Sequence, residues 1–252
     1  MPEFVNQDLT GSTFRSCNLV DVTMRGVELN RVTIRDSEVV DLDIHAEIVR
    51  LTVNGVDVGP LVEAELDRRY PDRPKMRPTS AAGFRAAWDT VERLWAGTVE
   101  RARRLDPDRL HESVDGEWSF IETLRHLSFA TDCWVRRAIL GDPSPWDPLD
   151  LPWDGMADTP GVPRDRQVRP TLDEALALRH SRMATVRDYV DRLTPAVLAS
   201  GTQPVDGPGW PPARSFPVAE CLRVVLNEEW EHRLYAERDL AVLESRSKSE
   251  LA

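Results

Sequence analysis

The sequence has few lysines and no long hydrophobic run. Its only lysines are Lys75 and Lys248, and its net charge is −11. These features argue against a nucleic-acid partner, because binding to a phosphate backbone draws on clustered lysine and arginine. Since no stretch of about 18 uncharged apolar residues is present, we expect no membrane-spanning helix and no membrane partner. The 41% apolar content and eight tryptophans are enough to fill a sizeable core.

Cysteine is also scarce. Cys17, Cys133 and Cys221 are odd in number, widely separated and never in a C-x-x-C pair. This pattern suggests neither a disulfide framework nor a zinc knuckle, so we expect three reduced, buried thiols. The first residues lack the basic and apolar regions of a secretory signal, and we therefore expect a cytoplasmic protein.

The N-terminal part of the chain is a repeat. An apolar residue recurs at every fifth position without a miss, which fits neither the helical period of about 3.6 nor the strand period of 2. The positions between are mostly polar. The residues of this stripe are Phe4, Leu9, Phe14, Leu19, Met24, Leu29, Ile34, Val39, Ile44 and Val49.

This stripe resembles the pentapeptide-repeat family, whose members wind a square, right-handed β-helix with the fifth-residue side chain inside. The resemblance predicts such a β-helix over residues 1–58, with the stripe and Cys17 in its interior. Residues 51–58 alternate around Asn54-Gly55, which predicts a hairpin or a closing strand. Because such a short solenoid leaves its ends open, we expect it to dock on another part of the protein.

The rest of the chain predicts helices. A short helix and linker occupy residues 59–79, and an amphipathic helix with Trp88 and Trp95 on one stripe covers 80–105. Capping boxes begin two more helices at residues 119 and 171, and a fourth covers 215–244. We therefore predict an α+β, multidomain protein in which a four-helix bundle over 80–246 follows the β-helix. The long connections 142–170 and 199–214 contain tryptophans, so we expect them to be ordered and to line a site.

Two predicted helices carry residues suited to a metal. Glu228 and His232 are four apart, so both project from one helix face, and His126 lies on another helix. One carboxylate and two imidazoles can hold a divalent ion and leave a position open for substrate. Zinc is the favoured metal, and iron, nickel or manganese would also fit. The alternatives are a core histidine at position 126 and a surface ion pair between Glu228 and His232.

The pattern Trp-Ser, then Glu122, then His126-Leu on one predicted helix, with His232-Arg and a following Tyr on the last one, resembles the DinB superfamily over residues 80–245. That resemblance implies a divalent metal held by His126, Glu228 and His232. Most relatives have histidine at the position of Glu228. The set His, Glu, His is similar to the branch of mycothiol-dependent maleylpyruvate isomerases.

Further residues are candidates for supporting roles, although no catalytic residue can be assigned. Glu122 can orient the His126 ring or cap its helix, and Arg233 can neutralise an anionic ligand. His180 is a candidate fourth ligand or base, with a surface or core histidine as the alternative. Tyr235 and Trp210 are candidates for contact with substrate.

The resemblance implies a metal-dependent transferase or isomerase that uses a low-molecular-weight thiol and an electrophilic substrate. The arginine-rich composition is typical of a high-GC bacterial coding sequence, which favours mycothiol over bacillithiol or glutathione. Three alternatives stay open: a metal-dependent hydrolase, a bundle that binds metal without activity, and a non-enzymatic interaction protein with an acidic repeat module. The resemblance also makes a homodimer possible.

Overall fold

The computed structural model describes residues 3–250, with side chains to residue 246. The chain divides into two compact units, Met1–Ala46 and Glu47–Ala252. No helix among the described residues is long and apolar enough to cross a membrane.

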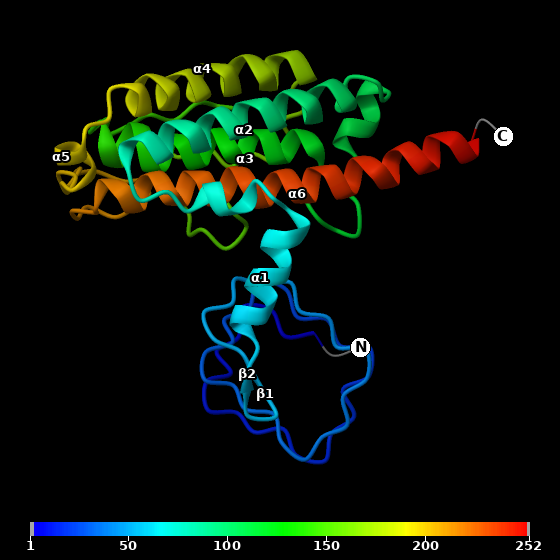
Figure 1. The fold of residues 1–252 in the computed structure, drawn as a ribbon. Helices are drawn as coiled ribbons and strands as arrows, with labels where there is room; N and C mark the ends of the chain where they lie inside the picture. Colours follow the sequence, from blue (N-terminus) through cyan, green and yellow to red (C-terminus); the bar gives the residue numbers. More distant parts are fainter. Residues whose placement is uncertain (1–2, 251–252) are drawn as a thin grey trace. The chain divides into compact units, whose positions relative to one another are not determined.

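The N-terminal unit keeps the period of five in its backbone. Within residues 3–46 a residue with positive φ recurs at every fifth position, two residues after each of the first eight apolar residues of the stripe: Asn6, Gly11, Ser16, Asp21, Gly26, Arg31, Asp36 and Asp41. Figure 1 shows this segment winding in successive wide turns. Residues 3–46 contain no strand, and the backbone hydrogen bond found there is local, from Ser12 N–H to Leu9 O. The ladder of a β-helix is therefore not shown.

The predicted burial of the stripe is wrong. Phe14 is 62% exposed, Leu19 52% and Ile34 65%, and Cys17 is exposed as well. A solenoid hides its apolar side chains only when they meet inside each coil and neighbouring coils cover them. Within residues 3–46 the backbone winds in wide turns, and the side chains of the stripe there are 45–67% exposed.

The second unit begins with the predicted hairpin. Strands β1 (Thr52–Val53) and β2 (Val56–Asp57) pair antiparallel. Asn54 and Gly55 both have positive φ, as a two-residue turn of this kind requires. Helix α1 (Gly59–Arg69) and the 3₁₀ helix η1 (Arg73–Met76) follow. Arg73 joins them through ion pairs with Glu63 and Asp67, both at 2.8 Å.

Four long helical segments form the predicted bundle, in which α2, α3, α4 and α6 lie side by side (Figure 1). The helix α2 covers Ala81–Ala102 and α4 covers Leu172–Asp191. The α-helix α3 (Phe120–Thr131) continues as a π-helix, η3 (Asp132–Ile139). Helix α6 covers Val218–Glu250, with a 3₁₀ helix, η2 (Pro107–His111), and a short helix, α5 (Pro195–Leu198), in the connections.

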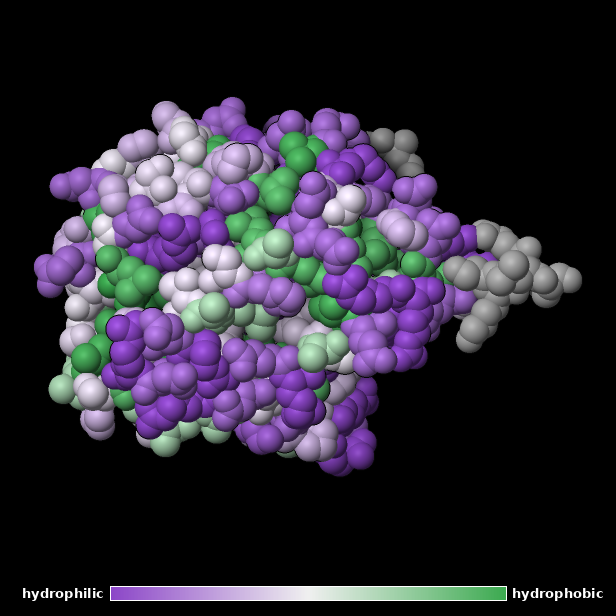
Figure 2. All heavy atoms as spheres, turned by 90° about the horizontal axis from the view of Figure 1, so that it is seen from above, coloured by the Kyte–Doolittle hydropathy of each residue, from purple (hydrophilic) through white to green (hydrophobic). Residues whose placement is uncertain are grey.

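The bundle buries the apolar stripes that its helices carry. Phe84, Trp88 and Trp95 of α2 are 1–2% exposed. They pack in one cluster with Leu124 of α3 and Leu222 of α6. Both predicted capping boxes are present, at the starts of α3 and α4. On the face shown in Figure 2, hydrophobic residues form separate patches among hydrophilic ones. Cys133 and Cys221 are buried, as expected.

Candidate metal centre

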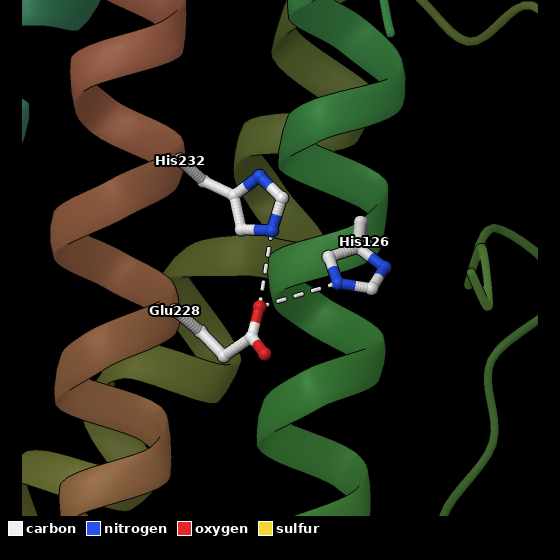
Figure 3. Close-up of side chains that lie close together, drawn as sticks. All are labelled: His126, Glu228 and His232. Atoms are coloured by element: carbon white, nitrogen blue, oxygen red, sulfur yellow. Dashed lines mark hydrogen bonds and ion pairs between the residues drawn. The ribbon is translucent and has the colours of Figure 1, made fainter. Parts of the chain in front are cut away.

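Three side chains from two helices converge in the bundle. His126 comes from α3, and Glu228 and His232 come from α6 (Figure 3). Their donor atoms all lie within 4.8 Å of one another. Both imidazole Nε2 atoms face the same carboxylate oxygen, Oε2 of Glu228, at 3.3 Å for His126 and 3.0 Å for His232. Two ligands of one tetrahedral zinc ion lie about 3.3 Å apart when each bond is about 2 Å.

The helix that carries two of these residues is anchored next to the site. Glu229, beside Glu228, is 1% exposed and forms a buried ion pair with Arg179 of α4 at 2.5 Å. Trp95 of α2 donates from Nε1 to the backbone oxygen of Glu229 at 3.2 Å, and the Arg179 guanidinium lies 4.5 Å from the Trp95 ring. These contacts fix this turn of α6 against α2 and α4.

The surroundings of His126 fit a metal ligand better than a histidine that serves only in the core. The ring is buried, and its Nδ1 lies 2.9 Å from the backbone oxygen of Leu151. Both ring nitrogens therefore face oxygen acceptors, whereas a neutral imidazole has only one N–H to donate. If Nδ1 donates to Leu151, Nε2 presents a lone pair toward Glu228. A cation between these two atoms would satisfy both, so the donor set fits a metal.

The charges of the site agree with this reading. Burial by itself would raise the pKa of Glu228, but the interactions of the carboxylate with the His126 and His232 rings outweigh burial and hold the pKa far below its usual range. Burial lowers the pKa of His126, against the opposing effect of Glu228. The carboxylate is thus charged and the buried ring neutral at pH 7, and these are the protonation states that metal ligands require.

Aromatic side chains surround the three residues. The Trp118 ring lies 4.4 Å from that of His126 and stacks on His232 at 5.7 Å. Tyr235 points its edge toward His232 at 6.0 Å. Phe129 lies 6.3 Å from His126.

The two long connections add to this aromatic cluster. Trp146 and Trp153, both in the connection 142–170, contact Phe129 at 5.6 and 6.4 Å. Trp210, in the connection 199–214, contacts Trp153 at 5.2 Å. The connection 142–170 therefore lies at the site, as expected, since Leu151 also belongs to it, whereas Trp210 of the connection 199–214 reaches this cluster through Trp153.

Other sequence candidates lie elsewhere. Glu122 caps α3, since Ser119 N–H donates to its Oε2 at 2.9 Å, and it also pairs with Arg166. His180 is exposed on α4 and is not part of the cluster. The Arg233 guanidinium contacts Thr98 and Glu237 at 3.4 and 3.5 Å and does not contact the three donors.

Sequence reasoning missed two groups that act on the site. One is the backbone oxygen of Leu151, the partner that orients His126 in place of Glu122; a main-chain atom in a loop leaves no signal in the sequence. The other is Trp118, which covers both imidazoles. Its place directly before the helix cap at Ser119, about two helical turns before His126, is a signal that could have been used.

A family model described as the DinB superfamily matches residues 90–236. The chain belongs to this superfamily. The match runs from α2 into α6 and includes all three donor residues, while the period-five unit lies outside it. No curated protein and no solved structure matches the chain.

Proposed function

We propose that this DinB-superfamily protein is a metal-dependent transferase or isomerase that uses a low-molecular-weight thiol. The observation that carries the proposal is the convergence of His126, Glu228 and His232 with both Nε2 atoms directed at one carboxylate oxygen. A structural zinc site closes its coordination with four protein ligands, whereas three protein ligands leave a position for substrate. Among the described residues this cluster offers three.

These three residues would hold the metal through Nε2 of each histidine and a carboxylate oxygen of Glu228. A bound divalent cation lowers the pKa of a coordinated thiol, so that the nucleophilic thiolate is present near pH 7. Leu151 keeps the His126 ring oriented through Nδ1. Trp118 and Phe129 provide an apolar wall beside the rings, which excludes water and favours an unsaturated or otherwise apolar electrophile.

The choice of mycothiol rests on two sequence features. The His, Glu, His set resembles that of mycothiol-dependent maleylpyruvate isomerases, and the arginine-rich composition favours an organism of the kind that makes this thiol.

Tyr235 and Trp210 are 39% and 37% exposed, so both can also contact a ligand that enters from solvent.

The test uses protein purified without added metal. We expect about one divalent ion per chain, loss of that ion in His232→Ala, and retention in the control His180→Ala, which replaces an exposed histidine of α4. Both variants should stay folded. In small zinc domains the metal supplies about 10 kcal/mol or more of folding free energy, but here the buried core of the bundle supplies the stability.

Activity is then measured as conjugation of an electrophile with mycothiol, bacillithiol or glutathione. Conjugation by the wild type and by His180→Ala, and its absence in His232→Ala, would support the proposal. Full conjugation by metal-free His232→Ala would overturn the mechanism. Thiol-independent hydrolysis that is lost in His232→Ala would instead assign a metal-dependent hydrolase.

A further inference from the structure

Three consecutive residues of the connection between η3 and α4 are each fixed to the segment that carries His126. The Leu149 oxygen accepts a hydrogen bond from Arg125 Nε at 2.7 Å, and the Leu151 oxygen faces His126 Nδ1 at 2.9 Å. Between them, the Asp150 side chain faces Asp132, at the start of η3. Two adjacent residues of α3, Arg125 and His126, thus face the backbone oxygens of Leu149 and Leu151.

The contacts of Arg125 anchor the connection to α3. Arg125 is 1% exposed, and its guanidinium donates to three backbone oxygens: Leu149, Val168 at 3.1 Å and Asp165 at 2.6 Å. Two stretches of the connection, at Leu149 and at 165–168, are therefore tied to the residue beside His126. A buried guanidinium satisfied by carbonyl groups fixes backbone positions, because its donors have a rigid planar arrangement.

The contacts of Asp150 also fix the backbone of this connection. Asp150 and Asp132 are both 0% exposed. Asp132 accepts from Arg182 of α4 at 2.8 Å, and Asp150 Oδ2 accepts from Asp147 N–H at 2.9 Å. Oδ1 of Asp150 is buried without a hydrogen-bond partner among the described side chains. A protonated carboxyl can offer its O–H to Asp132, whereas two charged carboxylates would repel each other.

We propose that Asp150 and Arg125 are positioning residues that place the Leu151 oxygen against His126 and so select the ring tautomer with the proton on Nδ1 and the lone pair on Nε2. The inference rests on His126 being a ligand in the proposed function. Metal-ligating histidines commonly donate the other ring N–H to such an acceptor, and loss of this partner lowers metal affinity about 10–100-fold.

The first measurement is the ¹⁵N shift of the His126 ring nitrogens in the metal-free wild type at neutral pH, assigned by comparison with His126→Gln. We expect the Nδ1–H tautomer. The Nε2–H tautomer in the wild type would by itself overturn the inference, and no variant is needed for this result. Because this measurement needs no metal, it decides the inference even if the wild type binds none. Absence of bound metal would contradict the proposed function and leave the inference about the tautomer in place.

The second measurement compares variants by titration with Zn²⁺. Asp150→Ala should give a mixture of tautomers and an affinity about 10–100-fold lower, whereas Asp150→Asn should keep the wild-type tautomer and affinity, since an amide can still donate toward Asp132. Arg125→Lys serves as a second variant if Asp150→Ala does not fold, and it should also weaken binding. Wild-type affinity in a folded Asp150→Ala or Arg125→Lys protein would overturn the inference.

Arg137→Met is the matched control. Arg137 is also 1% exposed and also donates to loop carbonyls, those of Pro143 and Gly207 at 2.6 and 2.8 Å, and these acceptors lie outside residues 149–151. Its replacement should lower the unfolding midpoint and leave the His126 tautomer unchanged. A tautomer shift in this control equal to that in Asp150→Ala would show a general loosening of the fold and overturn the specific role of Asp150.

Discussion

Phe14 of the N-terminal unit and Phe84 of α2 are the same residue type, and each belongs to a regular apolar stripe. Phe84 is 1% exposed and Phe14 is 62% exposed. The stripe of α2 faces other amphipathic helices, whereas the side chains of the period-five stripe do not pack together within residues 3–46. A regular apolar period thus sets the repeat of the backbone, but burial requires a second apolar surface in contact.

The largest effect on stability is expected when each of these two phenylalanines is replaced by alanine. Phe84→Ala should lower the free energy of unfolding by about 3–5 kcal/mol, because it removes a large buried side chain and leaves a cavity. Phe14→Ala should change it by about 0.5 kcal/mol or less. Denaturant unfolding measures both changes when it is followed by far-UV circular dichroism of the whole chain and by tryptophan fluorescence, which reports on the second unit because all eight tryptophans lie there. A large loss of stability in Phe14→Ala would show that the stripe is buried in solution.

The comparison can be sharpened with two neighbouring glutamates of α6. Glu229→Gln should destabilise the protein by about 3–5 kcal/mol, because it leaves the buried Arg179 charge without its partner. Glu228→Gln should lose metal and change stability by about 1 kcal/mol or less, since this side chain is 30% exposed. Unfolding midpoints and bound metal per chain separate the two roles. Equal destabilisation by both changes would contradict this division between anchor and ligand.

A smaller effect tests how burial acts on one carboxyl group. Burial, assisted by the charge of Asp132, raises the pKa of Asp150 to about 9, whereas in the unfolded chain an aspartate has a pKa of about 3.9. Between these values the unfolded state has lost the proton that the folded state keeps. Wild-type stability from this group is therefore present below about pH 4 and decreases as the pH rises toward 9, by at most about 1.4 kcal/mol per pH unit.

Asp150→Asn removes this dependence, because an amide does not titrate. The free energy of unfolding of Asp150→Asn minus that of the wild type should increase between about pH 5 and about pH 8. The measurement is denaturant unfolding of both proteins across this range. A difference that stays constant or decreases with pH would show that Asp150 is charged in the folded protein.

Much of the bundle could be predicted from local sequence. The capping boxes at Ser119 and Thr171 fixed two helix starts to the residue, because each satisfies its own backbone donors. The spacing of Glu228 and His232 placed both on one face of α6 for the same local reason. The π-helical turn at Asp132–Ile139 was not predicted, since its stretch reads as a continuation of α3.

The sequence by itself determined the elements with local causes: the four helices, the hairpin at Asn54-Gly55, the five-residue backbone period and the pairing of Glu228 with His232. Tertiary structure decided the rest, because those features depend on contacts between distant residues. It brought His126 to Glu228, turned the His126 ring with the Leu151 oxygen, and left the N-terminal stripe exposed where no partner surface was supplied within that unit. A period can specify which face of a segment is apolar, but only the packing of the whole chain specifies what that face meets.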